Sequence, residues 1–336
     1  MKNQKKIIVT GGAGYIGSHC VISLIDKGYV PIVLDNFSNS YSNVLQKIEK
    51  ITKKKVIFYK VDLRNTSKIN SIFKKHVCHA VIHCAGFKSV NESSSVPIRY
   101  FENNIQSTLS LLESMRKNKV FRLIFSSSAS VYNSDQKLPL DETALTGKTS
   151  NPYGTSKYLI ECILKDISKF DHRWKIGIAR YFNPISNHFS GLIKDDPKDK
   201  FGNLIFNIIN VAKKKQPYLR INGNDYKTKD GTCIRDFIHV VDLAEGHSAM
   251  LKADLLKNGC EIYNFGTGKG HTVKELILAF EKNVGVRIPL KYSKRQKGDI
   301  PISYCKNSKA KKKLSWKPKH DIDKAMIDIK SMFENY

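Results

Sequence analysis

The sequence predicts an α/β protein with a doubly wound parallel sheet and a smaller mixed α/β lobe. Two observations carry this prediction. Short apolar runs alternate with amphipathic helical patterns through the first half of the chain, and the runs lack polar alternation, as expected of strands covered by helices on both faces. A glycine-rich turn also separates the first predicted strand from the first predicted helix, as at the start of a βαβ unit.

The predicted elements follow in order from the N-terminus. Residues 5–10 (KKIIVT) predict the first strand, and the apolar residues of 15–28 recur at helical spacing. Further strands are predicted over residues 29–35, 56–62, 79–85 and 121–128. After residues 174–184 the alternation lapses into loops such as DDPKDKFGN. We therefore expect a first domain at 1–182 with a return segment near 237–268, and a lobe formed by 183–236 and 269–336.

Composition and charge exclude several classes of protein. The chain has 336 residues, 41% of them hydrophobic and 26% charged, as in globular proteins. Its net charge is +27, but the lysine runs lie at the ends of helical segments, which predicts solvated surfaces and no nucleic-acid partner. No apolar stretch is long enough for a secretion signal or a membrane span. The seven scattered cysteines indicate reduced thiols in a cytoplasmic protein, and no Cys/His spacing predicts a metal site.

The motif TGGAGYIG predicts a phosphate-binding turn. It contains G-x-x-G-x-x-G at Gly11, Gly14 and Gly17, and G-x-G-x-x-G if Gly12 is taken as its first glycine. Between a strand and a helix, such glycines let backbone N–H groups and the helix N-terminus face a pyrophosphate. A nucleoside-triphosphate loop needs lysine after the last glycine, where this chain has Ser18. The turn therefore predicts a dinucleotide-binding (Rossmann) sheet.

The second predicted strand ends at Asp35, about twenty residues after the glycine turn, where a carboxylate binds the ribose 2′-hydroxyl of NAD. The following residues NFSNS contain no arginine to accept the 2′-phosphate of NADP. NAD is therefore the predicted cofactor. Asp62, which ends the third predicted strand, is expected at the same edge of the sheet.

The fifth predicted strand ends in hydroxyl residues that include Ser128, and NPYGTSK then places Tyr153 and Lys157 on one face of a helix. A free tyrosine has a pKa of about 10, so a base that works near neutral pH needs about 4 kcal/mol of phenolate stabilisation. An ammonium at about 5 Å supplies about 3 kcal/mol. We expect Lys157, together with oxidised nicotinamide, to make Tyr153 a base, with Ser128 bonded to the reacting oxygen.

These motifs resemble the extended short-chain dehydrogenase/reductase family and, within it, the UDP-glucose (UDP-galactose) 4-epimerases. The resemblance rests on VTGGAGYIGSH, LDNFSNS, IHCAGFKSVNES, FSSSASVY, NPYGTSK, ARYFNP, GNDYKTKDGTCIRDFIHVVDLAEGH and YNFGTGKGHTV, in this order. It implies interconversion of UDP-galactose and UDP-glucose through a 4-keto sugar, with NAD taking and returning the C4 hydride. It also implies a homodimer formed through helices near residues 97–117 and 153–170.

By position, the resemblance assigns two sets of binding residues. The cofactor set is Gly11, Gly14, Tyr15, Ile16, Gly17, Asp35, Asn36, Asn39, Ser40, Asp62, Leu63, Lys88, Asn103, Lys157 and Tyr181. The nucleotide-sugar set is Ser128, Tyr153, Asn183, Asn203, Leu204, Arg235, Asp299 and Ser303. Arg235 is expected on the diphosphate, because its planar fork matches phosphate oxygens.

The chain departs from the family pattern at three positions. Gln296 stands where an arginine is expected near the diphosphate, with Arg295 or Lys297 as substitutes, and Asn222 stands where an aromatic residue lies beneath the uracil. A bulky gate residue of some members is Ser303 here, which predicts that N-acetylated UDP-hexoses (UDP-GlcNAc and UDP-GalNAc) are also accepted.

Two alternatives remain open from the sequence. The chain has Ala129 and Ser130 in place of the acid pair that nucleotide-sugar dehydratases carry, so 4,6-dehydration is disfavoured. A 4-epimerase of another nucleotide sugar, such as a UDP-uronic acid, is the nearer enzymatic alternative. A non-catalytic dinucleotide-binding module is the other, although such modules typically lack the tyrosine or the lysine.

Overall fold

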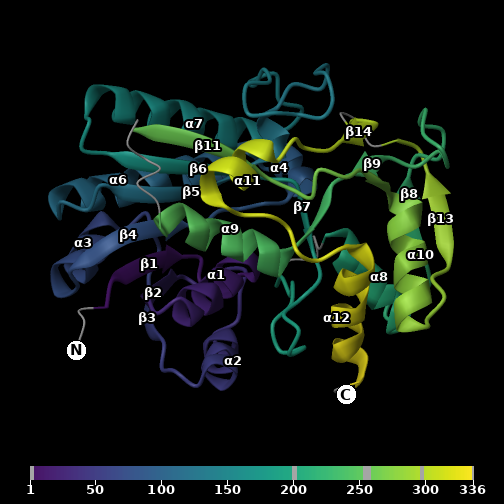
Figure 1. Cartoon of the computed structure of the whole chain (residues 1–336), viewed down its shortest axis with the longest axis horizontal. Coiled ribbons are helices and arrows are strands. Elements are labelled where there is room, and N and C mark those ends of the chain that lie inside the picture. The colour runs from purple at the N-terminus through teal and green to yellow at the C-terminus, as the bar shows by residue number, and fades with distance from the viewer. Residues whose placement is uncertain (1–3, 199–202, 253–258, 296–298, 335–336) are drawn as a thin grey trace.

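A seven-stranded parallel sheet forms the centre of the computed structural model, which describes residues 4–198, 203–252, 259–295 and 299–334 (Figure 1). From one edge to the other, the strands are β11 (Cys260–Phe265), β6 (Lys175–Tyr181), β5 (Arg122–Ser128), β4 (Cys78–His83), β1 (Lys6–Thr10), β2 (Val30–Asp35) and β3 (Ile57–Lys60). Every neighbouring pair is parallel. The structure thus confirms the predicted doubly wound sheet.

Helices cover both faces of this sheet, and each face has its own apolar core. The helices on one face are α1 (Tyr15–Asp26), α2 (Asn43–Thr52), α9 (Val240–Lys252) and α11 (Ser308–Leu314). Those on the other face are α3 (Thr66–Lys75), α6 (Ser107–Lys117) and α7 (Pro152–Phe170). The short segments α4 (Val90–Ser95), α5 (Pro97–Phe101) and η1 (Glu102–Gln106) precede α6, and η2 (Ala129–Val131) follows β5.

The strand order reverses between β1 and β4, and ligands of such sheets bind at the carboxyl ends of the strands beside this point. The register brings the strand ends level there: Thr10 pairs with both Leu34 and His83, and Ser128 pairs with Tyr181. Residues that follow these strands therefore meet at one edge of the sheet.

A smaller region lies beside this sheet, to the right in Figure 1. Its strands pair as β7 (Asn183–Ile185) with β10 (Phe237–His239), β8 (Leu219–Asn222) with β13 (Leu290–Ser293), and β9 (Ile234–Arg235) with β12 (His271–Thr272) and β14 (Ile302–Ser303). Its helices are α8 (Leu204–Ala212), α10 (Val273–Val284) and α12 (Ile322–Glu334). Side chains of these elements form a third apolar core.

One detail differs from the sequence-based expectations. The third strand ends at Lys60, before Asp62, and its side chains are largely exposed, because β3 is the last strand at its edge of the sheet. The lysine run near residue 311 does lie at a helix end, with Lys311, Lys312 and Lys313 in the last turn of α11. In the described part of the chain, no helix combines the length and the apolarity needed to cross a membrane.

Candidate active site

The glycine turn between β1 and α1 forms the floor of a first cavity at the switch in strand order. Gly11 has a φ of +66°, in the left-handed region, and a Cβ on Gly17 would lie 2.1 Å from the Gly11 carbonyl oxygen. Helix α1 begins after Gly14 without a side-chain cap or an acidic residue in its first turn. Its N-terminal N–H groups are thus left to bind an anion, so the turn fits a pyrophosphate.

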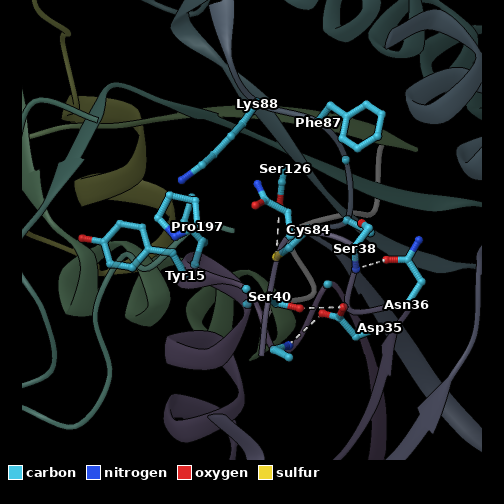
Figure 2. Close-up of a pocket in the computed structure, with 18 of the residues that line it drawn as sticks. Tyr15, Asp35, Asn36, Ser38, Ser40, Cys84, Phe87, Lys88, Ser126 and Pro197 are labelled. Carbon is cyan, nitrogen blue, oxygen red and sulfur yellow. Dashed lines mark hydrogen bonds between the residues drawn. The ribbon is translucent and has the colours of Figure 1, made fainter. Parts of the chain in front are cut away.

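Asp35, at the end of β2, is buried beside this turn and organises it (Figure 2). Its carboxylate accepts hydrogen bonds from the backbone N–H groups of Ala13 (3.0 Å) and Phe37 (2.8 Å) and from the Ser40 hydroxyl (3.0 Å). Because a carboxylate has about four lone-pair sites, these three bonds leave room for one ribose hydroxyl. The Asp35 carboxylate can therefore hold the surrounding loop and bind a ligand hydroxyl at the same time.

All residues of the expected cofactor set line the first cavity. They come from the glycine turn, from the segments after β2, β3 and β4, from η1, from α7 and from β6. Asp62 already forms an ion pair there with the Arg64 guanidinium, at 2.8 Å. This contact lowers the pKa of the Asp62 carboxyl to about 2. Cys84 and Ser126 also line this cavity, and no sequence motif assigned either of them to the cofactor.

Residues 194–198, which we call the strap, cross to the first cavity from the segment after β7, and 194–197 contribute to its lining. The Lys88 ammonium lies 2.8 Å from an Asp195 carboxylate oxygen, and Figure 2 shows Lys88 near Pro197 and Tyr15. The Lys198 ammonium donates to the Phe37 carbonyl oxygen at 2.7 Å. Two lysine contacts thus fasten the strap, and the sequence indicated only a loop here.

A second cavity of about 1040 Å³ adjoins the first and is lined by all residues of the expected nucleotide-sugar set. Tyr15, Tyr153 and Tyr181 line both cavities. At its far wall Arg235 and Asp299 form an ion pair, and the Tyr226 hydroxyl donates to Asp299 at 3.1 Å. Arg235 therefore lines the second cavity with its guanidinium held by Asp299.

The residues near the expected uracil and diphosphate that depart from the family pattern do not all fall within the described structure. Asn222 is not among the described residues that line the second cavity, and its side-chain oxygen accepts a bond from Ser293 at 2.9 Å. Arg295 is held by Asp225 at 2.7 Å, also away from the lining. In this structure Arg295 thus binds Asp225 and does not line the second cavity. Gln296 and Lys297 lie outside the described residues.

Helix α7 carries Tyr153 and Lys157 to the junction of the two cavities. The helix starts there because Pro152 occupies its first turn and the Asn151 side chain caps it by accepting from Gly154 N–H at 2.8 Å. The Lys157 ammonium donates to the Ser126 carbonyl oxygen at 2.8 Å. Burial lowers the pKa of Lys157 to about 8, which leaves it mostly protonated at neutral pH.

The expectation that Lys157 lowers the pKa of Tyr153 is wrong for the chain without its cofactor. Burial raises the pKa of Tyr153, and the hydrogen bond with Ser128 only partly opposes this effect. The lysine does not offset the burial because its ammonium is directed at Ser126 and lies 4.8 Å from the centre of the Phe125 ring. In the chain alone, burial therefore outweighs the groups that would lower the pKa of Tyr153.

A buried ion pair holds α7 against the sheet. The Arg180 guanidinium of β6 forms two hydrogen bonds with Glu161 of α7, at 3.0 and 2.6 Å, and both side chains are almost fully buried. Glu161 also accepts a bond from the Ser127 hydroxyl at 2.5 Å. The pair fixes the helix one turn after Lys157. The sequence analysis did not single out either residue, because partners 19 positions apart leave no local signal.

A glycine turn at the switch of a parallel sheet, and a Tyr-x-x-x-Lys pair where two cavities meet, define the class of short-chain dehydrogenase/reductase enzymes. Residues 7–266 match the NAD dependent epimerase/dehydratase family, and the chain belongs to this family.

The similar proteins cover nearly the whole chain. A UDP-glucose 4-epimerase of Dictyostelium discoideum is 46% identical over 95% of this chain and 92% of its own length. A UDP-glucose 4-epimerase of Bacillus subtilis (strain 168) is 44% identical over 96% and 95%. The crystal structure of the Bifidobacterium longum UDP-glucose 4-epimerase, in complex with NAD⁺ and UDP, has a TM-score of 0.95 at 44% identity and covers 98% of both chains.

Proposed function

We propose that the protein is an isomerase that interconverts UDP-galactose and UDP-glucose. The observation that carries this proposal is the meeting of the two cavities at Tyr153, with Lys157 and Ser128 beside it. The UDP-glucose 4-epimerases described above support UDP-hexose over a UDP-uronic acid. The presence of both Tyr153 and Lys157 argues against a non-catalytic module.

NAD is the cofactor, and the first cavity fits it. The pyrophosphate would lie on the glycine turn, whose close backbone packing requires Gly17 because a Cβ there would collide with the Gly11 carbonyl, and the adenosine ribose would lie at Asp35. Lys88 and Lys157 supply positive charge along the cavity. When bound, NAD supplies a hydride acceptor and donor for C4 of the hexose.

Residues of the chain handle the proton. The phenol oxygen of Tyr153 accepts the proton of the C4 hydroxyl and later returns it, and Ser128 holds the reacting oxygen by a hydrogen bond. Lys157 is held by Ser126 and adds a positive charge near the phenolate. Because the phenol is not acidic in the chain alone, we expect Tyr153 to work as a base when the oxidised cofactor adds its positive charge.

In the second cavity, we propose that Arg235 binds the diphosphate, since Asp299 already orients its guanidinium. Asn183, Asn203 and Leu204 line the same space and would hold the remainder of the nucleotide sugar.

Incubation of the pure protein with UDP-galactose, without a reductant, tests the proposed reaction. We expect UDP-glucose to accumulate to an equilibrium that is the same from either sugar. A parallel incubation with a UDP-uronic acid that yields its 4-epimer, while UDP-galactose stays unchanged, would favour the alternative epimerase. Recovery of both nucleotide sugars unchanged, with NAD bound, would favour the non-catalytic module.

Asp35→Ala is expected to weaken NAD binding by about tenfold or more. The substitution removes a charge-assisted hydrogen bond to the ribose, of about 1.5–3 kcal/mol, and frees the backbone of Ala13 and Phe37. Quenching of protein fluorescence measures the NAD dissociation constant. Asp26→Ala, at the exposed end of α1, is the control. Equal affinity in both variants would contradict the role of Asp35.

We also propose that the protein accepts N-acetylated UDP-hexoses. Ser303 lines the second cavity, and its small side chain leaves space there for an N-acetyl group. Ser303→Tyr is expected to lower kcat/KM for UDP-N-acetylglucosamine at least about tenfold, since overpacking a buried site costs about 1–3 kcal/mol. UDP-galactose turnover should fall less. Coupled assays of both sugars, with Ser303→Ala as the control, measure the ratio. An unchanged ratio would remove the gate hypothesis.

We propose a division into residues 1–182 with 237–268, and 183–236 with 269–336. Two features support it: β11 completes the main sheet, and the third apolar core comes, apart from Phe237 at the boundary, from residues of the second unit. Helix α11 refines this division, because Ala310 and Leu314 pack into the core of the first unit. The seven free cysteines support a cytoplasmic location.

A homodimer is proposed through the helices near residues 97–117 and 153–170. These helices expose apolar side chains, with Ile98 72%, Leu109 46% and Leu159 39% exposed. Ile98→Glu combined with Leu159→Glu should weaken the dimer at least about tenfold, because each places an unpaired charge in the interface. Sedimentation velocity measures the change. Leu278→Glu, 53% exposed on α10, is the control and should not alter it.

A further inference from the structure

Three metal-binding side chains meet beneath the first cavity. Cys20 of α1, Cys84 after β4 and His247 of α9 bring their sulfur and ring nitrogen atoms within 4.8 Å of one another. Both cysteines are free thiols. Cys20 and His247 are fully buried, whereas Cys84 is half-buried and lines the first cavity, as Figure 2 shows. The sequence spacing predicted no metal site, because the three residues come from distant parts of the chain.

The imidazole is oriented as a metal ligand. Its Nδ1 lies 2.9 Å from the Leu243 carbonyl oxygen, and a carbonyl only accepts, so Nδ1 carries the proton. The Nε2 atom therefore keeps its lone pair, and a backbone carbonyl bound to the other nitrogen is the usual support of a histidine ligand. In the present structure Nε2 is hydrogen-bonded to the Tyr181 hydroxyl.

We propose that Cys20, Cys84 and His247 form a site for one soft divalent cation, with Zn²⁺ as the representative ion. Two thiolates and one imidazole are the ligands that Zn²⁺ prefers, and binding releases two thiol protons to solvent. Tetrahedral Zn²⁺ sets its sulfur and nitrogen ligands about 3.5–3.8 Å apart, so atoms that now lie within 4.8 Å of one another need to approach by about 1.3 Å at most. The Ser126 hydroxyl contacts Cys84 and the Tyr181 hydroxyl contacts His247, so both hydroxyls lie next to the proposed site.

The position of Cys84 couples this site to the cofactor. Among the three ligands Cys84 alone lines the first cavity, so an ion reaches the cluster through the space that the dinucleotide occupies. Coordination of His247 also breaks its bond with Tyr181, a residue that lines both cavities. The ion and NAD therefore oppose each other, and each weakens the binding of the other by the same factor.

Titration of the full chain with Zn²⁺, with and without added NAD, tests the site without any need for turnover. We expect one Zn²⁺ per chain, bound at least tenfold more weakly in Cys20→Ala and Cys84→Ala, and at least tenfold more weakly when NAD is saturating. Cys78→Ala, on the strand that precedes Cys84, is the matched control and should bind as the original chain does. Thermal unfolding without metal checks that each variant is folded.

Titration with Cd²⁺ shows which atoms bind, because thiolate–cadmium charge-transfer absorption counts the sulfur ligands. Two thiolates are expected in the original chain and one in each cluster variant. Equal Zn²⁺ affinity in all variants, or no charge-transfer band, would overturn the site. A Zn²⁺ affinity that does not depend on NAD would overturn the coupling.

Discussion

Tyr153→Phe is expected to lower kcat for UDP-galactose by about 10²–10⁴-fold, the usual contribution of a general acid or base. The variant lacks only the phenol oxygen, at the junction of the two cavities, so NAD binding should persist. The raised pKa of Tyr153 in the chain alone adds a second expectation: the phenol should ionise at lower pH with NAD⁺ bound than without it.

A coupled assay of UDP-glucose formation measures kcat, and ultraviolet difference spectra at increasing pH report the phenolate. Tyr158→Phe, on the same helix, is the control. It should retain turnover, and the phenolate signal of Tyr153 should still appear at lower pH with NAD⁺ bound. Full activity of the Tyr153 variant would show that another group takes the proton.

Arg180→Met is expected to lower the free energy of unfolding by about 3–5 kcal/mol, because it leaves the Glu161 carboxylate buried without its partner. The loss should also reduce activity, since the pair fixes α7 one turn after Lys157. Chemical denaturation measures the change in stability.

Arg173→Met is a closely matched control. Arg173 also forms two bonds with a carboxylate, that of Asp171, and packs on an aromatic ring, but the pair is exposed. Its loss should cost much less stability than that of Arg180, because solvent screens an exposed pair. Adding Glu161→Leu to Arg180→Met should recover part of the stability, because the unpaired charge is then removed. A double variant as unstable as Arg180→Met would contradict this explanation.

The sequence was sufficient to predict the main sheet and the dinucleotide turn, because both depend on local patterns. Apolar runs without polar alternation identify buried strands, and glycines between a strand and a helix identify the tight turn at Gly11. The exposed edge strand β3 was not foreseen, because its exposure depends on its place in the sheet.

Other features depend on contacts between distant segments, and single-sequence patterns do not record them. The pairing of Arg180 with Glu161, and the fastening of the strap to Lys88, are of this kind. The acidity of Tyr153 was misjudged for the same reason: the four-residue spacing places Lys157 on the same helix face, whereas the fold directs its ammonium to Ser126.

The shared wall of Tyr15, Tyr153 and Tyr181 has a consequence for traffic through the enzyme. The hydride that leaves C4 of the sugar in the first half of the cycle returns to the sugar in the second half. NAD therefore ends each cycle oxidised and need not leave the first cavity. Only the nucleotide sugar has to bind and dissociate in each cycle, and it does so in the second cavity. One enzyme molecule with bound NAD can thus convert many substrate molecules in succession, whatever the concentration of free NAD.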